Sequence, residues 1–240
     1  MSTPPREPPR FELSFRAGYV TRRLVVLVLA LLVIHTAFQF DRFYTHRLPW
    51  QLQALFDLDE EAALPTWVST AMLGWAAILC AGIAGARRRA GSSEALAWRG
   101  LAWIMAYLSM DEVAGVHETV NSLSTISWTI PFGILALVVA CIYLPFVLRQ
   151  RPGTRLGFFA FGFVYVMGAA GVEFLTSQFF NESNKRQFVY SLDTVAEEGM
   201  EMFGVVILLY TLMRLIERER AEYATGTAAA PPAALESARR

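Results

Sequence analysis

Six long apolar stretches, separated by polar segments, constrain the fold of this chain more than any other feature. They lie near residues 20–40, 65–86, 98–118, 130–148, 156–178 and 193–216. The hydrocarbon core of a membrane is about 30 Å thick, which a helix crosses in about 20 residues, so each stretch is long enough. The chain is also 55% hydrophobic and 18% charged, too apolar for an ordinary soluble domain. We therefore predict an all-α fold, a polytopic transmembrane helix bundle with six spans.

The two ends of the chain differ from the apolar stretches. Residues 1–18 are rich in Pro and Arg and residues 219–240 in Ala and Pro, so we expect two disordered tails around a membrane domain at 19–218. Arg22 and Arg23 before an apolar run are also typical of a signal peptide. Because no small-x-small cleavage site follows that run, we interpret the first stretch as a retained helix.

The arginines predict the orientation of the spans. In a six-span arrangement, one side holds Arg16, Arg22, Arg23, Arg87, Arg88, Arg89, Arg99, Arg149, Arg151, Arg155, Arg214, Arg218 and Arg220. The other side holds Arg42, Arg47, Lys185 and Arg186. The positive-inside rule then places both termini in the cytoplasm. We expect a multi-pass protein of the cell inner membrane.

Charge and cysteine content exclude other classes of protein. The formal net charge is +0 and the basic residues are not concentrated on one face, which argues against nucleic acid as a partner. Cys80 and Cys141 each lie alone in an apolar run, so neither a zinc finger nor a disulfide framework is expected. Membrane lipid and a lipid or other apolar substrate are the expected partners.

Ionisable residues inside the apolar stretches carry the functional signal, because a charge there is costly and usually faces a partner or a cavity. They are His35, Asp111, Glu112, His117, Glu118, Glu173, Glu197, Glu198 and Glu201. Counting 1.5 Å per residue from the nearest arginine places His35, Asp111 and Glu201 roughly 18–20 Å from the cytoplasmic boundary. The same count places Glu118, Glu173 and Glu197 at roughly 25–28 Å. Four helices thus bring ionisable groups to matching heights in the outer half of the bilayer.

Helical phase strengthens this prediction. Asp111 and Glu118 are seven residues apart and share a helix face, while Glu198 and Glu201 are i, i+3 neighbours. Small residues such as those at 168–171 allow close approach of helices. We therefore predict that Asp111, Glu118, Glu173, Glu198 and Glu201 converge on one site, with His117 or His35 as the nitrogen ligand.

Several carboxylates cannot all stay ionised side by side in a low dielectric, so they need bound protons or a polyvalent cation. Carboxylate-rich sites with one or two histidines are typical of iron and manganese centres in helix bundles. A divalent metal is therefore the expected cofactor, iron or manganese before zinc or calcium. Zinc sites usually take more His or Cys ligands than three histidines supply.

Simpler interpretations of the same residues stay open. Thr194-x-x-Glu197 matches a capping box, so Glu197 could stabilise a helix N-terminus. His35 could be a packed, hydrogen-bonded core residue, and the acids at 57–61 could form a solvated loop. In a further alternative, the buried acids are protonated and hydrogen-bonded.

At these residues the chain resembles a group of uncharacterised bacterial multi-pass membrane proteins. The motifs are Leu-Pro-Thr-Trp at 64–67, Asp-Glu…His-Glu at 111–118, and Glu-Glu-x-x-Glu-Met at 197–202. A fainter similarity is to the alkaline ceramidase superfamily, polytopic zinc hydrolases, whose Ser, Asp and His set Ser109, Asp111 and His117 would match. The paired-histidine helix of that superfamily has no counterpart in this sequence.

The sequence favours a metal-dependent membrane enzyme that acts on a lipid or apolar substrate. The alternatives are a transporter for divalent cations or protons and a structural or sensor membrane protein. A transporter needs polar groups through the whole membrane. Apart from the arginines at their cytoplasmic ends, the inner halves of spans one, two, four, five and six contain no charged residue, which favours a closed site.

Overall fold

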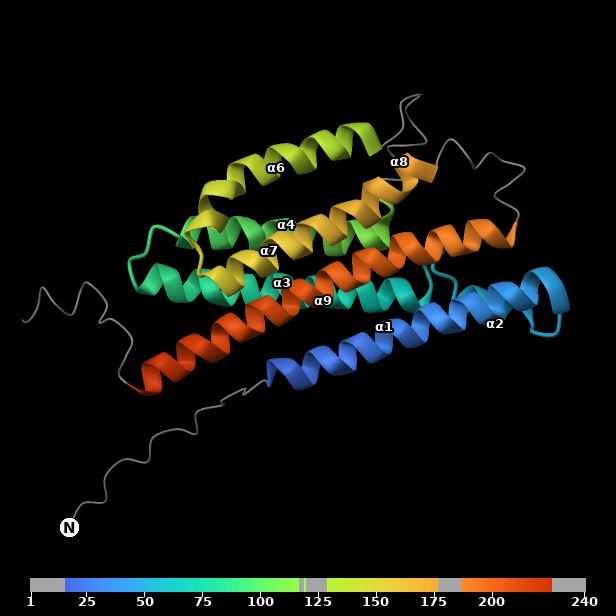
Figure 1. Cartoon of the computed structure of the whole chain (residues 1–240), viewed down its shortest axis with the longest axis horizontal. Helices are drawn as coiled ribbons and strands as arrows, with labels where there is room; N and C mark the ends of the chain where they lie inside the picture. The colour runs from blue at the N-terminus through green and yellow to red at the C-terminus, as the bar shows by residue number, and fades with distance from the viewer. Residues whose placement is uncertain (1–15, 117–118, 120–128, 177–186, 226–240) are drawn as a thin grey trace, which may run out of the picture.

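The computed structural model describes residues 16–116, 119, 129–176 and 187–225. Within these residues all regular structure is helical, which confirms the predicted all-α class. The elements are α1 (Ala17–Phe40), η1 (Asp41–Thr45), α2 (Trp50–Leu55), α3 (Leu64–Arg89), α4 (Ala95–Ala114), α6 (Thr129–Arg149), α7 (Pro152–Val166), η2 (Met167–Val172), α8 (Glu173–Thr176) and α9 (Phe188–Ala224). The π-helical turns η1 and η2 continue α1 and α7. The long helices lie roughly along one common axis (Figure 1).

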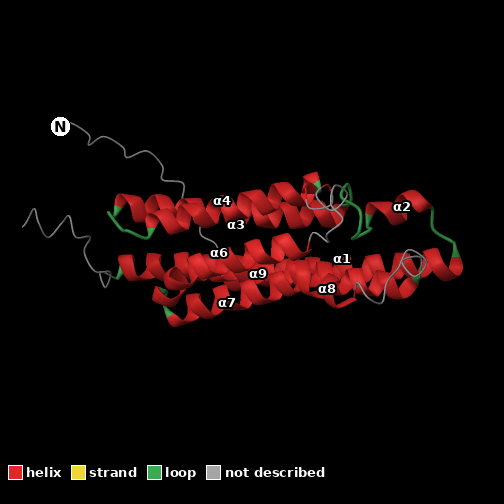
Figure 2. Ribbon diagram, turned by 90° about the horizontal axis from the view of Figure 1, so that it is seen from above, coloured by secondary structure: helices red, strands yellow, loops and turns green. Residues whose placement is uncertain are grey.

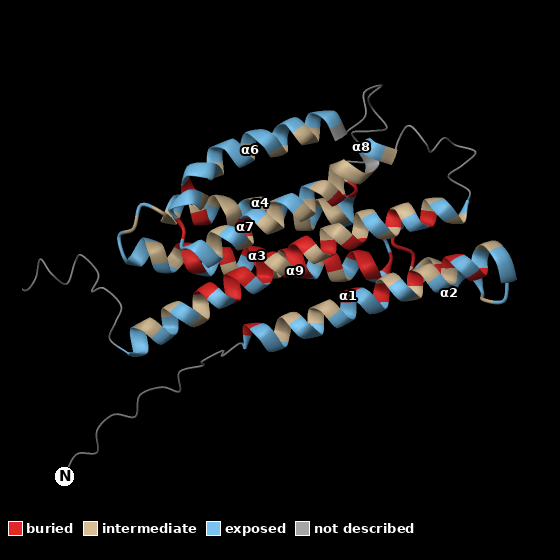
Figure 3. Ribbon diagram, in the orientation of Figure 1, coloured by how far each residue is buried: buried red, intermediate tan, exposed pale blue. Residues whose placement is uncertain are grey.

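The helix α9 lies at the centre of the bundle, where it packs against α1, α3 and α7. Its buried apolar residues are Met202, Val205, Val206, Leu208, Leu209, Leu212, Met213 and Leu215. Such residues on several faces are typical of a helix enclosed by other helices. Figure 2 shows α3 and α4 as one layer over a second layer that contains α1, α7 and α9. Figure 3 shows much of the buried surface on α9 and α3.

Five described helical segments are long and apolar enough to cross a membrane: Ala17–Thr45, Leu64–Arg89, Ile130–Arg149, Pro152–Thr176 and Phe188–Ala224. Their surfaces carry exposed large apolar side chains such as Val33 and Ile78, which hydrocarbon would surround. By helix length and hydropathy the chain is therefore a multi-pass membrane protein. The helix α4 is 20 residues long and packs along α3, but it carries Arg99, Asp111 and Glu112 and is not among the five.

Glycines set the spacing between α7 and α9. A Cβ on Gly157 would lie 2.7 Å from Thr211 Cγ2, and one on Gly204 would lie 3.0 Å from the backbone nitrogen of Tyr165. A Cβ on Gly168, in η2, would lie 2.8 Å from a backbone carbonyl oxygen of α9. Small residues of this kind let membrane helices approach closely. They bring the end of α7 and the turn η2 directly onto α9.

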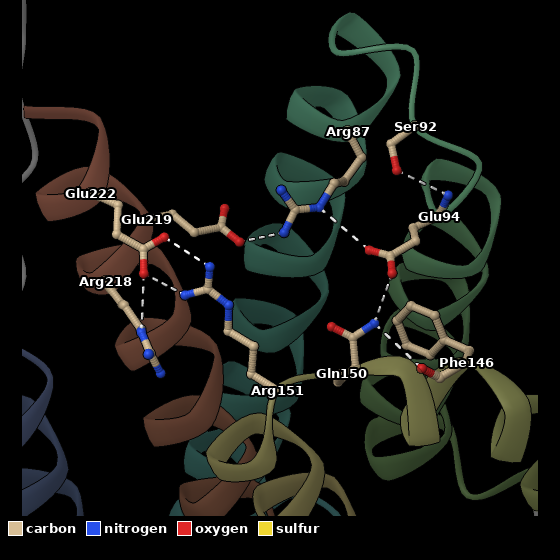
Figure 4. Close-up of polar contacts among 9 residues, drawn as sticks. All are labelled: Arg87, Ser92, Glu94, Phe146, Gln150, Arg151, Arg218, Glu219 and Glu222. Atoms are coloured by element: carbon tan, nitrogen blue, oxygen red, sulfur yellow. Dashed lines mark hydrogen bonds and ion pairs between the residues drawn. The ribbon is translucent and has the colours of Figure 1, made fainter. Parts of the chain in front are cut away.

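An ion-pair cluster holds the C-terminal end of α9 to two helix connections (Figure 4). Arg87, at the end of α3, pairs with Glu219, and its Nε lies 3.6 Å from Glu94 Oε2. Arg151, between α6 and α7, donates from Nη2 to Glu222 Oε2 at 2.9 Å. These pairs engage turns of α9 beyond residue 216, where the sixth span was predicted to end. Residues 219–224, which we predicted to lie in a disordered C-terminal tail, are part of the helix α9.

Candidate functional site

Four glutamates from two helices lie together toward the end of the bundle opposite the ion-pair cluster. The helix α9 supplies Glu197, Glu198 and Glu201, and α4 supplies Glu112. Glu198 lies close enough to Glu112 and Glu197 to interact with them electrostatically, which is what we mean by electrostatic reach. Glu201 is within electrostatic reach of the other three glutamates. All four side chains are half-buried. We call these four residues the acid cluster.

Tyr165, at the end of α7, adds a phenol to the acid cluster. Its side chain lies close enough to Glu201 to influence it as a hydrogen-bonding group, and close enough to Glu112 and Glu198 to interact with them electrostatically. A neutral phenol can donate one hydrogen bond to a carboxylate oxygen, so Tyr165 can orient Glu201. Sequence reasoning missed this role, because Tyr165 carries no pattern that separates it from Tyr143 or Tyr210 in the other apolar spans.

The turn η2 places backbone against Glu201. A Cβ on Gly168 would lie 2.9 Å from both Cγ and the backbone nitrogen of Glu201. The residues of η2, Met-Gly-Ala-Ala-Gly-Val, are mostly small, which makes this contact feasible. π-Helical turns often occur at functional sites. Glu173 begins α8 immediately after η2, but its side chain lies outside the described part of the structure.

The segment between α2 and α3 also lies near the acid cluster. Asp59 is exposed, yet its charge acts on Glu198. Gly115 ends α4 in the left-handed conformation, with φ of +52°, and a Cβ there would lie 2.9 Å from Glu61 Oε2. Only glycine combines this backbone conformation with such close approach. The acids of the predicted solvated loop therefore border the cluster.

A second polar network surrounds His35, which is 1% exposed. Its Nδ1 accepts a hydrogen bond of 3.0 Å from the backbone N–H of Leu58 and lies 3.4 Å from Asp57 Oδ1. Asp57 is also buried, and its Oδ2 accepts bonds from Gln39 Nε2 at 2.8 Å and Arg42 Nη1 at 3.4 Å. This arrangement corrects the interpretation of Asp57 as part of a solvated loop. The network ties the 57–61 segment to α1.

The hydrogen bond to Nδ1 constrains the protonation of His35. A neutral imidazole that accepts at Nδ1 carries its proton on Nε2. The Nε2 atom is buried and has no hydrogen-bond partner among the residues that the structure describes. In this tautomer Nε2 is a donor and not a metal ligand. Ligation of a metal by Nε2 would move the proton to Nδ1, which would break the bond from Leu58 and let Nδ1 donate to Asp57 Oδ1.

Asp41 organises the connection from α1 to α2. Its carboxylate accepts backbone bonds of 3.1 Å from Arg47 and 2.9 Å from Leu48, a 3.0 Å bond from Gln53 Nε2, and a bond from the Thr45 hydroxyl. A buried carboxylate with this many donors is well satisfied. We therefore assign Asp41 a structural role, which holds the polypeptide that precedes Asp57.

The structure thus brings together part of the predicted ligand set. Glu112, Glu197, Glu198 and Glu201 are neighbours, whereas His35 lies in the separate network with Asp57. Asp111 is half-buried and within electrostatic reach of Tyr107 on its own helix. His117 and Glu118 lie outside the described residues.

Two observations describe what the acid cluster can do chemically. Among the described residues, the charged groups that act on Glu198 and Glu201 are all acidic. In the same part of the chain, no three His, Cys, Asp or Glu side chains form a group arranged to hold a metal ion. The negative charge that these acids gather would be balanced by bound protons, by a cation, or by groups outside the described side chains.

Comparison with known proteins identifies a family but no activity. No curated protein and no solved structure matches the chain. Residues 24–215, which include the acid cluster and the His35–Asp57 network, match the family described as "Domain of unknown function (DUF8692)". Because the match covers well over half of the chain, the protein belongs to the DUF8692 family.

Proposed function

We propose that the protein is a metal-dependent membrane enzyme that acts on a lipid or other apolar substrate. The observation that carries this proposal is the acid cluster with Tyr165, because three helices bring four carboxylates and a phenol together inside the helix bundle. An all-oxygen donor set of this kind suits a hard divalent ion, with iron or manganese favoured when a histidine joins it. Such an ion would supply activation of water or dioxygen.

The described residues would hold this ion in distinct ways. Glu198 and Glu201 would be ligands, and Glu112 would supply a carboxylate from the facing helix. The remaining ligands would come from His117, Glu118 or Glu173, whose side chains are outside the described set. Tyr165 would donate to Glu201 and fix the orientation of its carboxylate, as outer-shell donors commonly do.

Packing on the other side of the acid cluster favours a closed site over a transport pathway. Between Glu201 and Arg214, α9 is lined by the buried apolar residues named above. The one buried polar side chain in that stretch is Thr211, whose hydroxyl donates to the Ile207 carbonyl at 2.7 Å. A transporter would need polar groups along this stretch to pass an ion.

Metal binding at the acid cluster can be tested with two variants of the same helix. Glu201→Gln replaces an ionisable ligand by a neutral amide of the same shape, and we expect metal occupancy to fall at least about tenfold. Glu217→Gln is the matched control, because Glu217 lies in the last turns of α9 and pairs with Arg214 at 3.0 Å. Elemental analysis of both variants and the wild type is the measurement. Equal occupancy in all three would contradict the assignment of Glu201 as a ligand.

We further propose that α4 also spans the membrane, as the third of six spans in chain order. The membrane would be the inner membrane, and both termini would lie in the cytoplasm. Arg87, Arg151 and Arg218 gather at the end of the bundle that holds the ion-pair cluster (Figure 4), which the positive-inside rule would place in the cytoplasm. Reporter fusions at residues 90 and 152 should give a cytoplasmic signal, and a fusion near residue 184 a periplasmic one. A reversed signal at any of these positions would refute this topology.

A further inference from the structure

The helix α6 is held to the bundle by its C-terminal half. Tyr143 donates from its hydroxyl to the Ala97 carbonyl at 3.1 Å. The ring of Phe146 packs edge-on against that of Trp98, with centroids 5.3 Å apart. Figure 3 shows α6 exposed over most of its length. A space therefore remains between the N-terminal half of α6 and the neighbouring segment formed by α7, η2 and α8.

An apolar groove of about 370 Å³ occupies this room. One wall is formed by residues of α6, among them Gly133, Ile134 and Leu137, and the other by residues of α7, η2 and α8, among them Ala170, Gly171 and Phe174. Every lining residue is apolar or glycine. Both walls belong to helices that are long and apolar enough to span the membrane, so the medium that meets this groove is hydrocarbon.

The groove is separated from the acid cluster by a single helical turn. Ala170 and Gly171 of η2 line the groove, whereas Gly168 of the same turn contacts Glu201. A helix with its side chains is about 10–12 Å across, and η2 is built from small residues, so this wall is thin. A molecule in the groove would therefore lie close to Glu201 while it stays in an apolar environment.

We propose that this groove binds the hydrocarbon chain of a membrane lipid, which is the apolar part of the substrate. The site is short: on α6 it extends from Ile130 to Leu137, whereas a partner transmembrane helix is about 20 residues long and would extend well beyond it. Its rim carries the bulky exposed side chains of Ile134, Leu137 and Phe174. Close helix packing needs small residues along the contact, so this rim disfavours a second helix and fits a narrow flexible chain.

The identification of the chain as part of a substrate rests on the proposed function, whereas lipid binding in the groove does not. Gly133→Phe fills the groove, and a Cβ at Gly133 meets nothing within 4 Å, so the variant should fold. Gly162→Phe is the matched control: a Cβ at Gly162 also meets nothing within 4 Å, and Gly162 does not line the groove. Ala170→Phe fills the groove from the opposite wall.

The test uses the full chain in phospholipid vesicles that contain a phospholipid with a photoreactive diazirine in its acyl chain. We expect cross-links to concentrate on the peptides that contain residues 130–137 and 166–174. Gly133→Phe and Ala170→Phe should reduce this labelling at least about fivefold, because the chain loses its enclosing contacts. Gly162→Phe should leave it unchanged. Labelling spread evenly over all exposed spans would show annular lipid only and would overturn the proposal.

The acid-cluster variant Glu201→Gln separates this inference from the proposed function. Retained groove labelling in Glu201→Gln, together with lost metal, supports both proposals. Retained labelling in a wild-type protein that contains no metal would leave the lipid groove in place and remove only its role in catalysis. Absence of preferential labelling in the wild type would overturn the groove whatever the metal content.

Discussion

Replacing Gly204 by valine is expected to disrupt the packing of α7 against α9. Of the single substitutions that we consider, it should cause the largest loss of stability. A Cβ at this position would lie 2.9 Å from Tyr165 Cβ, 3.0 Å from its nitrogen and 3.1 Å from its Cα. None of these atoms is the tip of a flexible side chain, so one helix must move. We expect a cost of about 3 kcal/mol, which corresponds to a decrease in Tm of roughly 6–12 °C. The same shift would separate Tyr165 from Glu201 and lower metal occupancy.

Thermal unfolding of the Gly204→Val variant can be followed with a thiol-reactive dye. Cys80 is buried and becomes reactive when the bundle opens, whereas Cys141 is exposed and should be replaced by serine in all variants. Gly162→Ala is the control, because a Cβ at Gly162 meets open space. Unfolding of Gly204→Val at the wild-type temperature would show that α7 and α9 are not packed as described.

Replacing Asp57 by alanine is expected to have the second largest effect. The change removes the acceptor of Gln39 Nε2 and leaves that buried donor without a partner. Leaving a buried polar group unpaired typically costs 1–3 kcal/mol, so we expect about 2 kcal/mol and a decrease in Tm of roughly 4–8 °C. The loop that carries Asp59 and Glu61 should also become more accessible to protease.

Asp57→Asn and Glu60→Ala distinguish this network from a general effect of charge removal. The amide of Asp57→Asn keeps one acceptor for Gln39, so that variant should lose less stability than Asp57→Ala. Glu60 is exposed, so Glu60→Ala should unfold at the wild-type temperature. If Asp57→Ala and Glu60→Ala had the same effect, the buried network would contribute nothing to stability.

The membrane class and much of the acid cluster could be predicted from the sequence. Stretches of about 20 apolar residues have few stable structures other than spanning helices, so their length alone indicates the class. Glu198 and Glu201 could be identified because a carboxylate deep in an apolar span cannot be explained as helix capping. Depth counting along each span then placed acids of different helices at similar heights.

The remaining parts of the site depend on tertiary contacts, which no local sequence pattern indicates. Asp57 lies in a polar segment before Pro65, and only the packing of that segment on α1 brings it to His35. Helical phase relates Asp111 to Glu118, but it does not say which face of α4 meets α9, and Glu112 is the residue found within reach of Glu198. The π-helical turn η2 likewise requires the close approach of Gly168 to α9, which depends on both helices.

The metal content of the wild-type protein is the most direct test of the central claim that the acid cluster is a metal site. The protein should be extracted in a mild detergent without chelator and examined by elemental analysis. We expect about one to two equivalents of iron or manganese per chain, because several carboxylates in one apolar layer need roughly that much positive charge. Less than about a tenth of an equivalent of any divalent metal would contradict the claim, because binding at the cluster would then be too weak to balance its charge.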